Sequence, residues 1–307
     1  MKRQKRCVII GASGQLGRAL ASFFSKDYAI VEAVRRHPRA DQVLIDLNDT
    51  AATTEVLKSL NPDLILIAGA YTNVDRCEED AFNCHQVNAA APLEIAHYAR
   101  KEGKFVVYYS TDHAFDGSKP SSYTESDPVH PLNVYGRSKV EGEEAVRQEI
   151  PNRHLILRTS WLYGPDFEER NFPLRLIKRL QGGERVPVPM DQWGSPTFTE
   201  DLAAATHFLI ERTTGGTFHV RGPDFINRSS YARQIALHFG LREDQLIPMP
   251  TTQLKQIAPR TLKIQLNCQK FKSLGGPPMR SAAEGLIALK GWRADFVVAE
   301  GIRKNKT

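Results

Sequence analysis

The stretch Cys7-Val8-Ile9-Ile10-Gly11-Ala12-Ser13-Gly14-Gln15-Leu16-Gly17 decides the fold of this chain. Its first four residues are apolar and rich in β-branched side chains, which predicts a short buried strand. Residues 18–24 read as a helix, so the glycines lie in a loop between a strand and a helix. There Gly11 allows a tight turn, Gly14 lets the backbone approach a pyrophosphate, and Gly17 lets helix and strand pack closely. We therefore expect a dinucleotide site, with a plain strand-to-helix turn as the alternative.

Apolar and helical segments continue to alternate along the first half of the chain. We expect strands at residues 29–34, 43–45, 64–68, 105–109 and 154–158, and a helix that begins at residues 87–92. This alternation predicts an α/β fold of the Rossmann type, a doubly wound parallel sheet with helices on both faces. The alternation weakens after residue 164. We therefore expect an NAD(P)-binding domain at 1–164 and a smaller substrate-binding domain at 165–307, whose segments can interleave.

The ends of the expected strands supply candidate cofactor contacts. Arg35 and Arg36 follow the second strand, where arginine suits the 2′-phosphate of NADP and an acidic residue suits the 2′-hydroxyl of NAD. They favour NADPH over NADH, which stays an alternative, and Glu32 lies too early in the strand to compete. Solvated loop arginines are the other reading. The expected cofactor contacts are Gly11, Ser13, Gly14, Gln15, Leu16, Gly17, Arg35, Arg36, Asp46, Leu47, Ala68, Gly69, Ala70, Asn88, Tyr135 and Lys139.

A second stretch, Tyr135-Gly136-Arg137-Ser138-Lys139, carries the candidate chemistry. Tyr135 and Lys139 are four residues apart, so on a helix they share one face. An ammonium beside a phenol favours the phenolate, which lowers the pKa of the tyrosine and makes it a usable proton donor. The pair alone also fits a half-buried ring beside a solvated lysine, so its reading depends on the rest of the chain.

The composition is that of an ordinary globular protein, with 41% hydrophobic and 25% charged residues among 307. The net charge of +6 is scattered apart from residues 2–6 and 35–36, so we do not expect a nucleic-acid partner. The four cysteines form no CxxC and no His/Cys cluster, which argues against a metal site and suits a reducing cytoplasm. No apolar stretch approaches membrane length, so we expect a cytoplasmic protein without a membrane segment.

Thr111 comes directly after the expected strand at 105–109 and Ser110, and it joins Tyr135 and Lys139 as a third candidate catalytic residue. Several motifs accompany the glycine loop and these three residues. They are Val87-Asn88-Ala89, Ser110-Thr111-Asp112-His113-Ala114-Phe115-Asp116-Gly117, Pro131-Leu132-Asn133-Val134-Tyr135-Gly136-Arg137-Ser138-Lys139, Arg158-Thr159-Ser160-Trp161-Leu162-Tyr163-Gly164 and Asp191-Gln192-Trp193-Gly194-Ser195-Pro196-Thr197. Over nearly the whole chain they resemble the dTDP-4-dehydrorhamnose reductase family of extended short-chain dehydrogenases. The last two motifs are much more specific than the glycine loop, which many unrelated oxidoreductases share.

The resemblance implies hydride transfer from a nicotinamide to C4 of a nucleotide-linked 4-keto-6-deoxy sugar, above all conversion of dTDP-4-dehydrorhamnose to dTDP-L-rhamnose. Tyr135 would give its proton to the carbonyl oxygen as that oxygen gains charge. Lys139 would hold the nicotinamide ribose and keep the pKa of the tyrosine low. Thr111 would hydrogen-bond the same oxygen.

The resemblance also implies the substrate contacts, which are Thr72, Val74, His113, Trp161, Asn171 and Arg260. Asn171 and Arg260 match diphosphate-side contacts of the family, although a loop cap and a surface charge are the plain alternatives. His113 and Ala114 stand where the family usually has Tyr and Val, which leaves the substituents of the sugar open. His113 is ionisable near neutral pH, so it either assists catalysis or shapes the pocket.

Two other functions stay open at this point. His113 and Ala114 motivate a reductase or an epimerase for another nucleotide-linked keto sugar. A regulatory subunit of methionine adenosyltransferase also resembles this family and binds a nicotinamide cofactor without catalysis, but a pure binding role would not need the complete Thr111, Tyr135 and Lys139 set. The sequence does not fix the oligomeric state, and a homodimer is one option.

Overall fold

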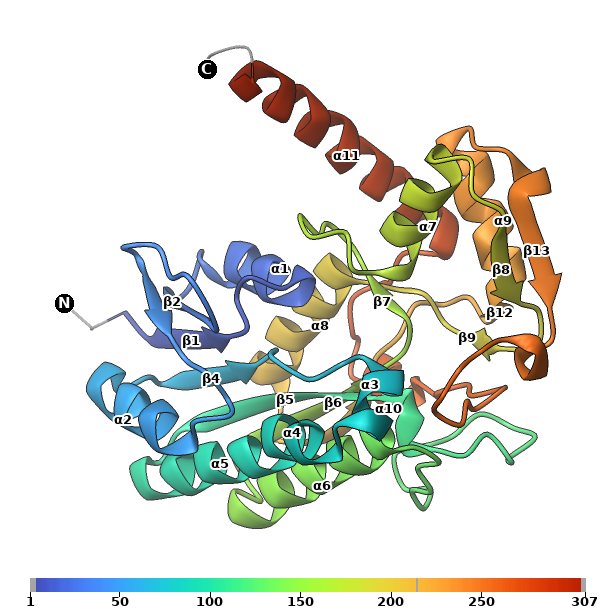
Figure 1. The fold of residues 1–307 in the computed structure, drawn as a ribbon. Helices are drawn as coiled ribbons and strands as arrows, with labels where there is room; N and C mark the ends of the chain where they lie inside the picture. Colours follow the sequence, from blue (N-terminus) through green and yellow to red (C-terminus); the bar gives the residue numbers. More distant parts are fainter. Residues whose placement is uncertain (1–3, 214, 305–307) are drawn as a thin grey trace.

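The computed structural model describes residues 4–213 and 215–304, with side chains described to residue 295 (Figure 1). A seven-stranded sheet in the order β11-β6-β5-β4-β1-β2-β3 forms its centre, and every neighbouring pair is parallel. Its strands are β1 (Arg6–Ile10), β2 (Ala29–Val34), β3 (Gln42–Leu44), β4 (Leu64–Ile67), β5 (Phe105–Thr111), β6 (His154–Thr159) and β11 (Gly216–His219). The doubly wound sheet predicted from the alternating pattern is confirmed.

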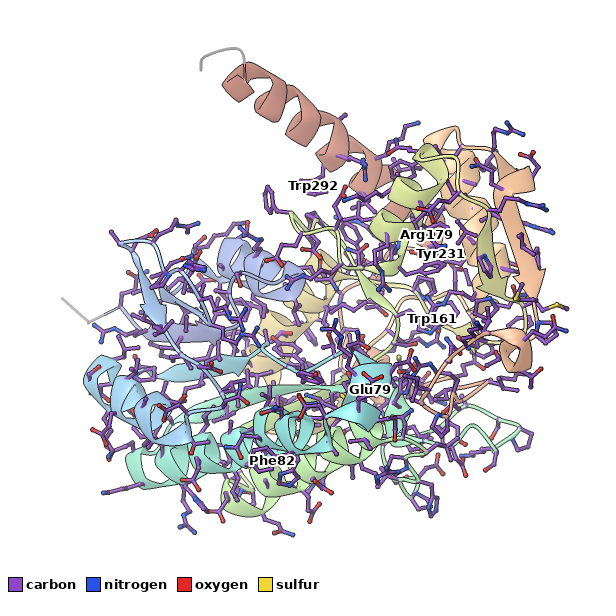
Figure 2. The ribbon with its side chains drawn as sticks, in the orientation of Figure 1. Glu79, Phe82, Trp161, Arg179, Tyr231 and Trp292 are labelled. Carbon is purple, nitrogen blue, oxygen red and sulfur yellow. The ribbon has the colours of Figure 1, made fainter. Side chains whose placement is uncertain are left out.

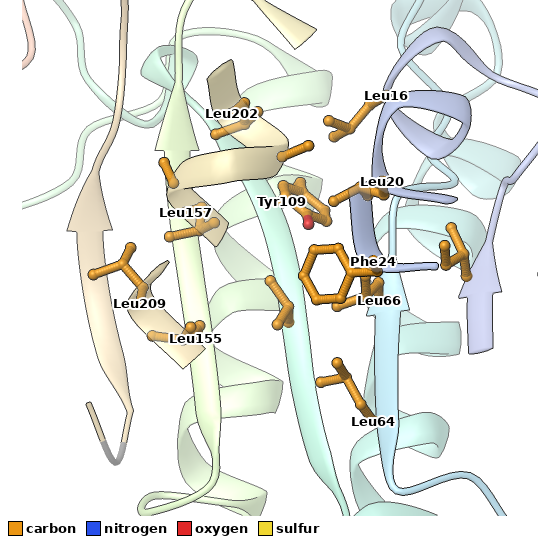
Figure 3. Close-up of a cluster of buried hydrophobic side chains, with 14 of the residues drawn as sticks. Leu16, Leu20, Phe24, Leu64, Leu66, Tyr109, Leu155, Leu157, Leu202 and Leu209 are labelled. Atoms are coloured by element: carbon orange, nitrogen blue, oxygen red, sulfur yellow. The ribbon is translucent and has the colours of Figure 1, made fainter. Parts of the chain in front are cut away.

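Helices cover both faces of this sheet, because alternate residues of each strand point to opposite sides. Leu64 and Leu66 of β4 enter one core with α1 (Gln15–Phe24) and α8 (Thr199–Arg212), as Figure 3 shows. Ile65 and Ile67 of the same strand enter the other core, with α2 (Thr50–Leu60), α5 (Ala91–Glu102) and α6 (Val134–Glu149). Strands buried on both faces explain why the sequence shows continuous apolar runs there.

A smaller lobe is built from the later part of the chain. It contains β7 (Leu162–Tyr163), α7 (Phe172–Gln181), β8 (Val186–Pro189), β9 (Trp193–Gly194), β10 (Thr197–Phe198), β12 (Ile226–Asn227), α9 (Arg228–Phe239), η3 (Glu243–Gln245), β13 (Leu246–Met249), η4 (Thr251–Gln253) and α11 (Ala282–Lys304). Its strands form two-stranded pairs, β7 with β10, β9 with β12 and β8 with β13. A separate hydrophobic core joins α7, α9, β8 and the start of α11.

The chain returns to the large sheet after it has entered the smaller lobe. Helix α8 packs on α1, and β11 pairs with β6 at the edge of the large sheet, so residues 199–219 serve the first lobe although they follow α7 and β8 in sequence (Figure 1). A short helix, α10 (Gln269–Ser273), also contacts β11. The large-sheet lobe therefore extends beyond residue 164 in sequence, and the assignment of binding roles to 1–164 and 165–307 stays a prediction.

The helix expected to begin at residues 87–92 is confirmed as α5, which begins at Ala91 and continues an earlier helical segment. Helix α3 (Val74–Glu79) stops before Asp80, which is not helical, and α4 (Ala81–His85) then continues through a π-helical turn, η1 (Gln86–Ala90), into α5. Pro92 in the first turn of α5 has no N–H to donate, and a π turn accommodates that gap. The backbone carbonyl of Asn88 accepts instead from the Tyr108 hydroxyl, at 2.5 Å.

Candidate active site

The glycine loop has a shape that only glycine permits at two positions. Gly11 has a φ of 86°, and a Cβ there would lie 2.6 Å from the Cα of Gly69. A Cβ on Gly17 would lie 2.3 Å from the carbonyl oxygen of Gly11. Gly14 is the N-cap residue of α1, and Leu16 in the first turn of that helix is buried. The loop therefore presents backbone and a helix N-terminus, a surface that suits a phosphate.

Neighbouring strand ends lie against this loop. The backbone N–H groups of Ala68 and Gly69, before Ala70, both donate to the Ile10 carbonyl, at 3.0 and 2.8 Å. Leu47 contacts the side of Gly69 where a Cβ would point, at 3.4 Å. These contacts bring the expected cofactor residues of three strand ends to one edge of the sheet.

Ser13, Asp46 and Asn88 differ in how many of their hydrogen-bonding groups already have partners within the protein. The backbone carbonyl of Ser13 accepts a hydrogen bond from the Arg18 side chain. The Asp46 carboxylate accepts from the backbone N–H and the side-chain amide of Asn48. Asn88 is buried, and both the oxygen and the nitrogen of its side-chain amide form hydrogen bonds. Its Oδ1 accepts from the Tyr71 N–H at 2.9 Å, and its Nδ2 donates to Ser138 Oγ at 3.1 Å. Asn88 thus joins the loop after β4 to α6.

Gln15 links the glycine loop to the smaller lobe. Its Nε2 donates to the Leu162 carbonyl at 3.3 Å, and its Oε1 accepts from Asn171 at 3.0 Å. Asn171 also donates to the Gly164 carbonyl and caps α7 by accepting from the Leu174 N–H. Because its amide is buried and engaged on both sides, the structure supports the loop-cap reading of Asn171.

Arg35 and Arg36 are exposed just beyond the end of β2. The neighbouring acidic residue Glu32 is occupied, because its carboxylate accepts from Arg39 at 3.1 Å and from Gln42 at 2.6 Å. An engaged carboxylate competes poorly for a ribose hydroxyl. Arg35 and Arg36 are therefore exposed cations next to the end of β2 and could contact a bound phosphate.

The candidate catalytic residues converge where β5 ends and α6 begins. Thr111 is the last residue of β5, and its Oγ1 accepts from the His113 N–H at 3.2 Å. Asn133 caps α6, and the helix then presents Tyr135, whose ring meets that of His113 edge-on at 5.6 Å. A Cβ on Gly136 would lie 2.4 Å from the His113 carbonyl oxygen, so glycine at this position lets the helix approach the strand end.

A buried hydrogen-bond chain ties this strand end to the smaller lobe. Thr111 Oγ1 donates to one carboxylate oxygen of Asp112 at 3.1 Å, and the Ser160 hydroxyl donates to the other at 2.6 Å. Ser160 in turn accepts from the backbone N–H of Ser195 at 3.2 Å. The chain orients Thr111 and connects three of the motifs that the sequence singled out.

Tyr135 is set to remain protonated. Burial raises the pKa of its phenol, and a hydrogen bond with Thr111 partly offsets that effect, while the Asp112 carboxylate raises it further. A phenol of raised pKa that contacts Thr111 can donate a proton to an oxygen bound beside both hydroxyls.

Lys139 is buried, at 2% exposure, with its ammonium 3.8 Å from the centre of the Tyr108 ring. Burial lowers its pKa to about 7, and the nearby Glu143 carboxylate opposes that shift. The expected lowering of the Tyr135 pKa by Lys139 is wrong for this structure, because burial raises that pKa and Lys139 is not among the groups that shift it. The Lys139 ammonium lies instead against the ring of Tyr108, and the Glu143 carboxylate is close enough to influence its charge.

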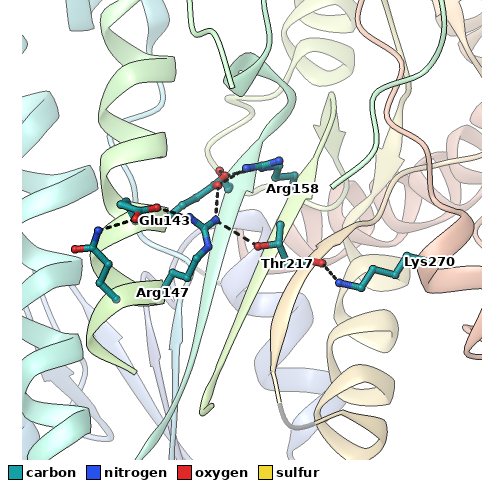
Figure 4. Close-up of polar contacts among 8 residues, drawn as sticks. Glu143, Arg147, Arg158, Thr217 and Lys270 are labelled. Atoms are coloured by element: carbon teal, nitrogen blue, oxygen red, sulfur yellow. Dashed lines mark hydrogen bonds and ion pairs between the residues drawn. The ribbon is translucent and has the colours of Figure 1, made fainter. Parts of the chain in front are cut away.

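Glu143 anchors the catalytic helix to the sheet. It accepts from Arg158 Nε at 2.9 Å and from Arg158 Nη2 at 2.6 Å, and both side chains are almost fully buried. Ser110 also donates to this carboxylate, and Arg147 contacts it from the next turn of α6 (Figure 4). These contacts fix α6 against β5 and β6, and with it the position of Tyr135 and Lys139.

An arginine stacked on aromatic rings lies at the junction with the smaller lobe. The Arg228 guanidinium lies 3.4 Å from the centre of the Trp161 ring and 4.6 Å from that of Phe172. Trp161 and Phe172 both stack on Tyr231, and Figure 2 shows Trp161 and Tyr231 within this lobe. Among the residues whose side chains the structure describes, 4–213 and 215–295, Arg228 has no ion-pair partner. Burial lowers its pKa to about 9; Tyr231 and the Asp112 carboxylate oppose that shift, and Arg175 and Arg260 add to it.

Arg260 reaches the other side of this region from a loop. Its Nη2 pairs with Asp75 of α3 at 2.7 Å, while its Nη1 is buried without a partner among the described residues. Asp75 also accepts from the N–H groups of Ile257 and Ala258, which brings the Arg260 loop to the start of α3. Thr72 and Val74 lie at that helix start, so the structure brings these three expected substrate residues together.

Several residues of the site were not singled out from the sequence. Asn133, Asp112, Ser160 and Glu143 act through hydrogen bonds to residues distant in sequence, and Arg228 is placed by the fold of the smaller lobe. An asparagine directly before a helix is a recognisable capping signal, so Asn133 could have been found. Asp112 and Ser160 lie within motifs quoted from the sequence, but their hydrogen bonds could not be read there, and nothing in the local sequence marks Glu143 or Arg228.

Membrane-spanning helices and clusters of metal ligands are both absent from the described part of the chain. None of its helices combines the length and apolarity needed to cross a membrane. Residues 4–213 and 215–304 also hold no group of three or more His, Cys, Asp or Glu side chains suited to a metal ion. All four cysteines are free and buried.

Comparisons with known sequences find relatives along nearly the whole chain. A family model described as the RmlD substrate binding domain matches residues 5–289. A dTDP-4-dehydrorhamnose reductase of Mycobacterium tuberculosis is 30% identical and aligns over 99% of this chain and 95% of its own length. A dTDP-4-keto-6-deoxy-D-glucose reductase of Streptomyces niveus is also 30% identical, over 94% of this chain and 93% of its own.

Solved structures give the same picture. A dTDP-4-dehydrorhamnose reductase of Bacillus anthracis, crystallised with NADP, superposes with a TM-score of 0.85 at 30% identity and covers 94% of this chain and 99% of its own. A UDP-glucose 4-epimerase of Thermotoga maritima reaches a TM-score of 0.83 at 16% identity, covering 95% of this chain and 99% of its own. The second likeness concerns the fold alone.

Proposed function

This chain belongs to the RmlD substrate-binding-domain family, and from that membership we propose that it is an NADPH-dependent reductase of a dTDP-4-keto-6-deoxyhexose. The substrate would be dTDP-4-dehydrorhamnose and the product dTDP-L-rhamnose. The observation that carries the proposal is the convergence of Thr111, Tyr135 and Lys139 where β5 ends and α6 begins.

The residues of this site suit the reduction of a carbonyl. The cofactor, when bound, supplies the hydride. The Tyr135 phenol, kept protonated by burial, gives its proton to the substrate oxygen as that oxygen gains charge. Thr111 would hydrogen-bond the same oxygen by turning its single hydroxyl hydrogen from Asp112, where it points in this structure, toward the substrate. Lys139 would hold the nicotinamide ribose and, when protonated, add positive charge near the reacting groups.

The glycine loop fits a dinucleotide, because Gly11 and Gly17 let the loop and the start of α1 pack closely against neighbouring backbone, and Gly14 carries no side chain at the helix N-terminus where a pyrophosphate would approach. Residues 11–17 would hold the pyrophosphate, and Asp46, Leu47 and residues 68–70 would line the adenine and ribose. The exposed Arg35 and Arg36 favour NADPH, since Glu32 is engaged by Arg39 and Gln42. The NADP-bound Bacillus anthracis relative supports this cofactor.

The substrate would lie between the two lobes, in contact with Thr72, Val74, His113, Trp161 and Arg260. The buried, unpartnered Nη1 of Arg260 supports a diphosphate contact there. Arg228 would supply a second one, because it carries a charge without a carboxylate partner in the described chain. We do not retain Asn171 as a direct contact, since its amide is engaged with Gln15, Gly164 and Leu174.

Reduction of a different nucleotide-linked keto sugar is the second candidate. The Streptomyces niveus relative is named for a dTDP-4-keto-6-deoxy-D-glucose, and His113 stands beside Tyr135 in the sugar region. The division of roles between residues 1–164 and 165–307, a cytoplasmic location and a homodimer stay predictions of the sequence.

The test is a screen of NADPH and NADH oxidation with purified protein and a panel of dTDP- and UDP-linked 4-keto-6-deoxy sugars. We expect one NADPH consumed per dTDP-sugar reduced, and Tyr135→Phe to lower kcat by about 10²- to 10⁴-fold with the Kd of NADPH unchanged. Tyr98→Phe removes a phenol that donates to the Leu57 carbonyl, and it serves as the matched control.

Each alternative gives a different result in this screen. Sugar product without net cofactor loss would identify an epimerase. Tight NADPH binding without any reduction, together with a co-purifying partner, would identify a regulatory subunit. Undiminished turnover in Tyr135→Phe would remove Tyr135 as the acid.

A further inference from the structure

The amide of Asn133 has only one orientation compatible with its surroundings. Its Oδ1 lies 2.8 Å from the Gly136 N–H, a group that can only donate. Its Nδ2 lies 3.0 Å from the Pro259 carbonyl, a group that can only accept. Exchanging the oxygen and the nitrogen would oppose donor to donor and acceptor to acceptor, so both contacts fix the amide independently.

This orientation determines the protonation of His113. Asn133 Nδ2 lies 3.1 Å from His113 Nδ1, and Nδ2 is a donor, so Nδ1 has to accept. An imidazole whose Nδ1 accepts is neutral and carries its proton on Nε2. Protonation of Nδ1 would place an N–H against the amide hydrogens of Asn133. The imidazolium form is therefore disfavoured by contact geometry.

The charges around His113 act in both directions. Burial lowers its pKa, the Asp112 carboxylate raises it, and Arg260 and Arg228 lower it. The phenol of Tyr135 meets the ring edge-on and stays protonated. Burial and two arginines outweigh one carboxylate, so the electrostatics agree with the neutral ring that Asn133 imposes.

The Nε2–H group of His113 is left free to bind a ligand. It has no acceptor among the residues whose side chains the structure describes, 4–213 and 215–295, and the ring is half-buried beside Tyr135 rather than sealed in a core. A donor of fixed direction next to the catalytic phenol suits an oxygen atom of a sugar, either a hydroxyl or the carbonyl oxygen itself.

We propose that His113 is a specificity residue that donates its Nε2–H to an oxygen of the bound hexose and takes no part in proton transfer; this rests on the proposed sugar-nucleotide function. An imidazole with Nε2 protonated and Nδ1 engaged has no free nitrogen to accept a proton. His113 therefore cannot act as the base that an epimerase needs, and it contributes the same hydrogen bond at pH 6 as at pH 8.

The tautomer can be read without substrate. Long-range ¹H–¹⁵N correlation spectra of histidine-labelled protein, with the His113 signals assigned from their loss in His113→Phe, should show Nε2 protonated and Nδ1 bare from pH 6 to 8. An Nδ1-protonated tautomer, or an imidazolium at pH 7, would overturn the proposal. This readout is independent of which sugar the protein reduces.

Asn133→Asp provides a sharper variant. Aspartate also caps helices well, so the start of α6 should form, but an oxygen now faces His113 Nδ1 in place of the amide nitrogen. We expect the proton to move to Nδ1 or the ring to become charged, and kcat/KM to gain a pH dependence that the wild type lacks. An unchanged His113 spectrum in this variant would contradict the proposed control by Asn133.

Steady-state kinetics test whether His113 donates a hydrogen bond to the bound sugar. His113→Phe keeps a ring and removes the donor, so KM for the sugar nucleotide should rise about 10-fold while the Kd of NADPH stays constant. His97→Phe, at a partly exposed position on α5 whose ring contacts Glu94 and Glu149, is the control. Unchanged KM and kcat in His113→Phe would sink the assigned donor role. A wild type that reduces none of the keto sugars would instead refute the proposed function, with the tautomer result unaffected.

Discussion

Glu143 of α6 and Arg158 of β6 form a two-pronged ion pair, at 2.9 and 2.6 Å, with side chains that are 1% and 3% exposed. The pair lies one helical turn beyond Lys139 and binds the helix that carries the catalytic residues to the strand that leads into Ser160 and Trp161. Because both charges are buried, removing either one leaves the other uncompensated.

Glu143→Gln should therefore lower the free energy of unfolding by about 3 kcal/mol, since it leaves the Arg158 charge buried without a carboxylate. Urea denaturation measures the change. Glu144→Gln is the matched control, because Glu144 is 49% exposed and its pairing with Arg147 contributes little. Equal stabilities for the two variants would contradict the importance of the buried pair.

Gly136→Ala should both destabilise the protein and lower kcat. The added Cβ would lie 2.4 Å from the His113 carbonyl oxygen and 2.9 Å from Pro131, so α6 has to shift, and Tyr135 with it. In an open helical position the same change is favourable by up to about 1 kcal/mol. A Cβ on Gly291 in α11 would meet no described atom within 4 Å, which makes Gly291→Ala the control. A Gly136→Ala protein with normal stability and kcat would show that the helix can retreat at no cost.

Lys139 should make stability depend on pH. Its ordinary pKa is 10.5, and burial lowers it to about 7 in the folded protein. Between these two values the unfolded chain holds a proton that the folded chain has released, so the free energy of unfolding rises with pH. Lys139→Met lacks this contribution. The stability of the wild type minus that of the variant should increase from pH 7 to pH 9 in urea titrations without cofactor, and a constant difference would refute the lowered pKa.

Arg228→Gln should raise KM for the sugar nucleotide by about 10- to 100-fold, because a charge-assisted hydrogen bond to the diphosphate is lost. The KM of NADPH should not change. Arg233 lies on the same helix α9 and is exposed, so Arg233→Gln controls for charge alone. If Arg228→Gln binds dTDP as tightly as the wild type in calorimetry, Arg228 only packs on Trp161 and Phe172.

The large sheet could be predicted because its signals are local. Continuous apolar runs such as residues 64–67, and the glycines at 11, 14 and 17, indicate strand and turn without knowledge of distant residues. The edge strand β11 could not be found in this way. Only four residues long, it joins the sheet because it pairs with β6, which lies far earlier in the chain.

The residues of the candidate site show the same difference between local signals and contacts with distant residues. Thr111, Tyr135 and Lys139 stand in a recognisable spacing, and the structure places them at one strand end. Asn171 was expected to meet the substrate, yet its amide is spent on Gln15 and on the start of α7, contacts that only the fold reveals. Arg228 went unnoticed because a lone arginine in sequence shows neither its aromatic stack nor its missing carboxylate.

The late return of α8 and β11 to the large sheet has a consequence for how the protein is made. The ribosome releases the chain from its N-terminus, so the first 164 residues emerge with one face of the sheet still lacking Leu202, Leu209 and Phe218 of its core. That face stays open until residues 199–219 follow, with the first elements of the smaller lobe already outside the ribosome. The two lobes therefore mature together during synthesis, and the nascent first half is the stage at which this protein most needs protection from aggregation.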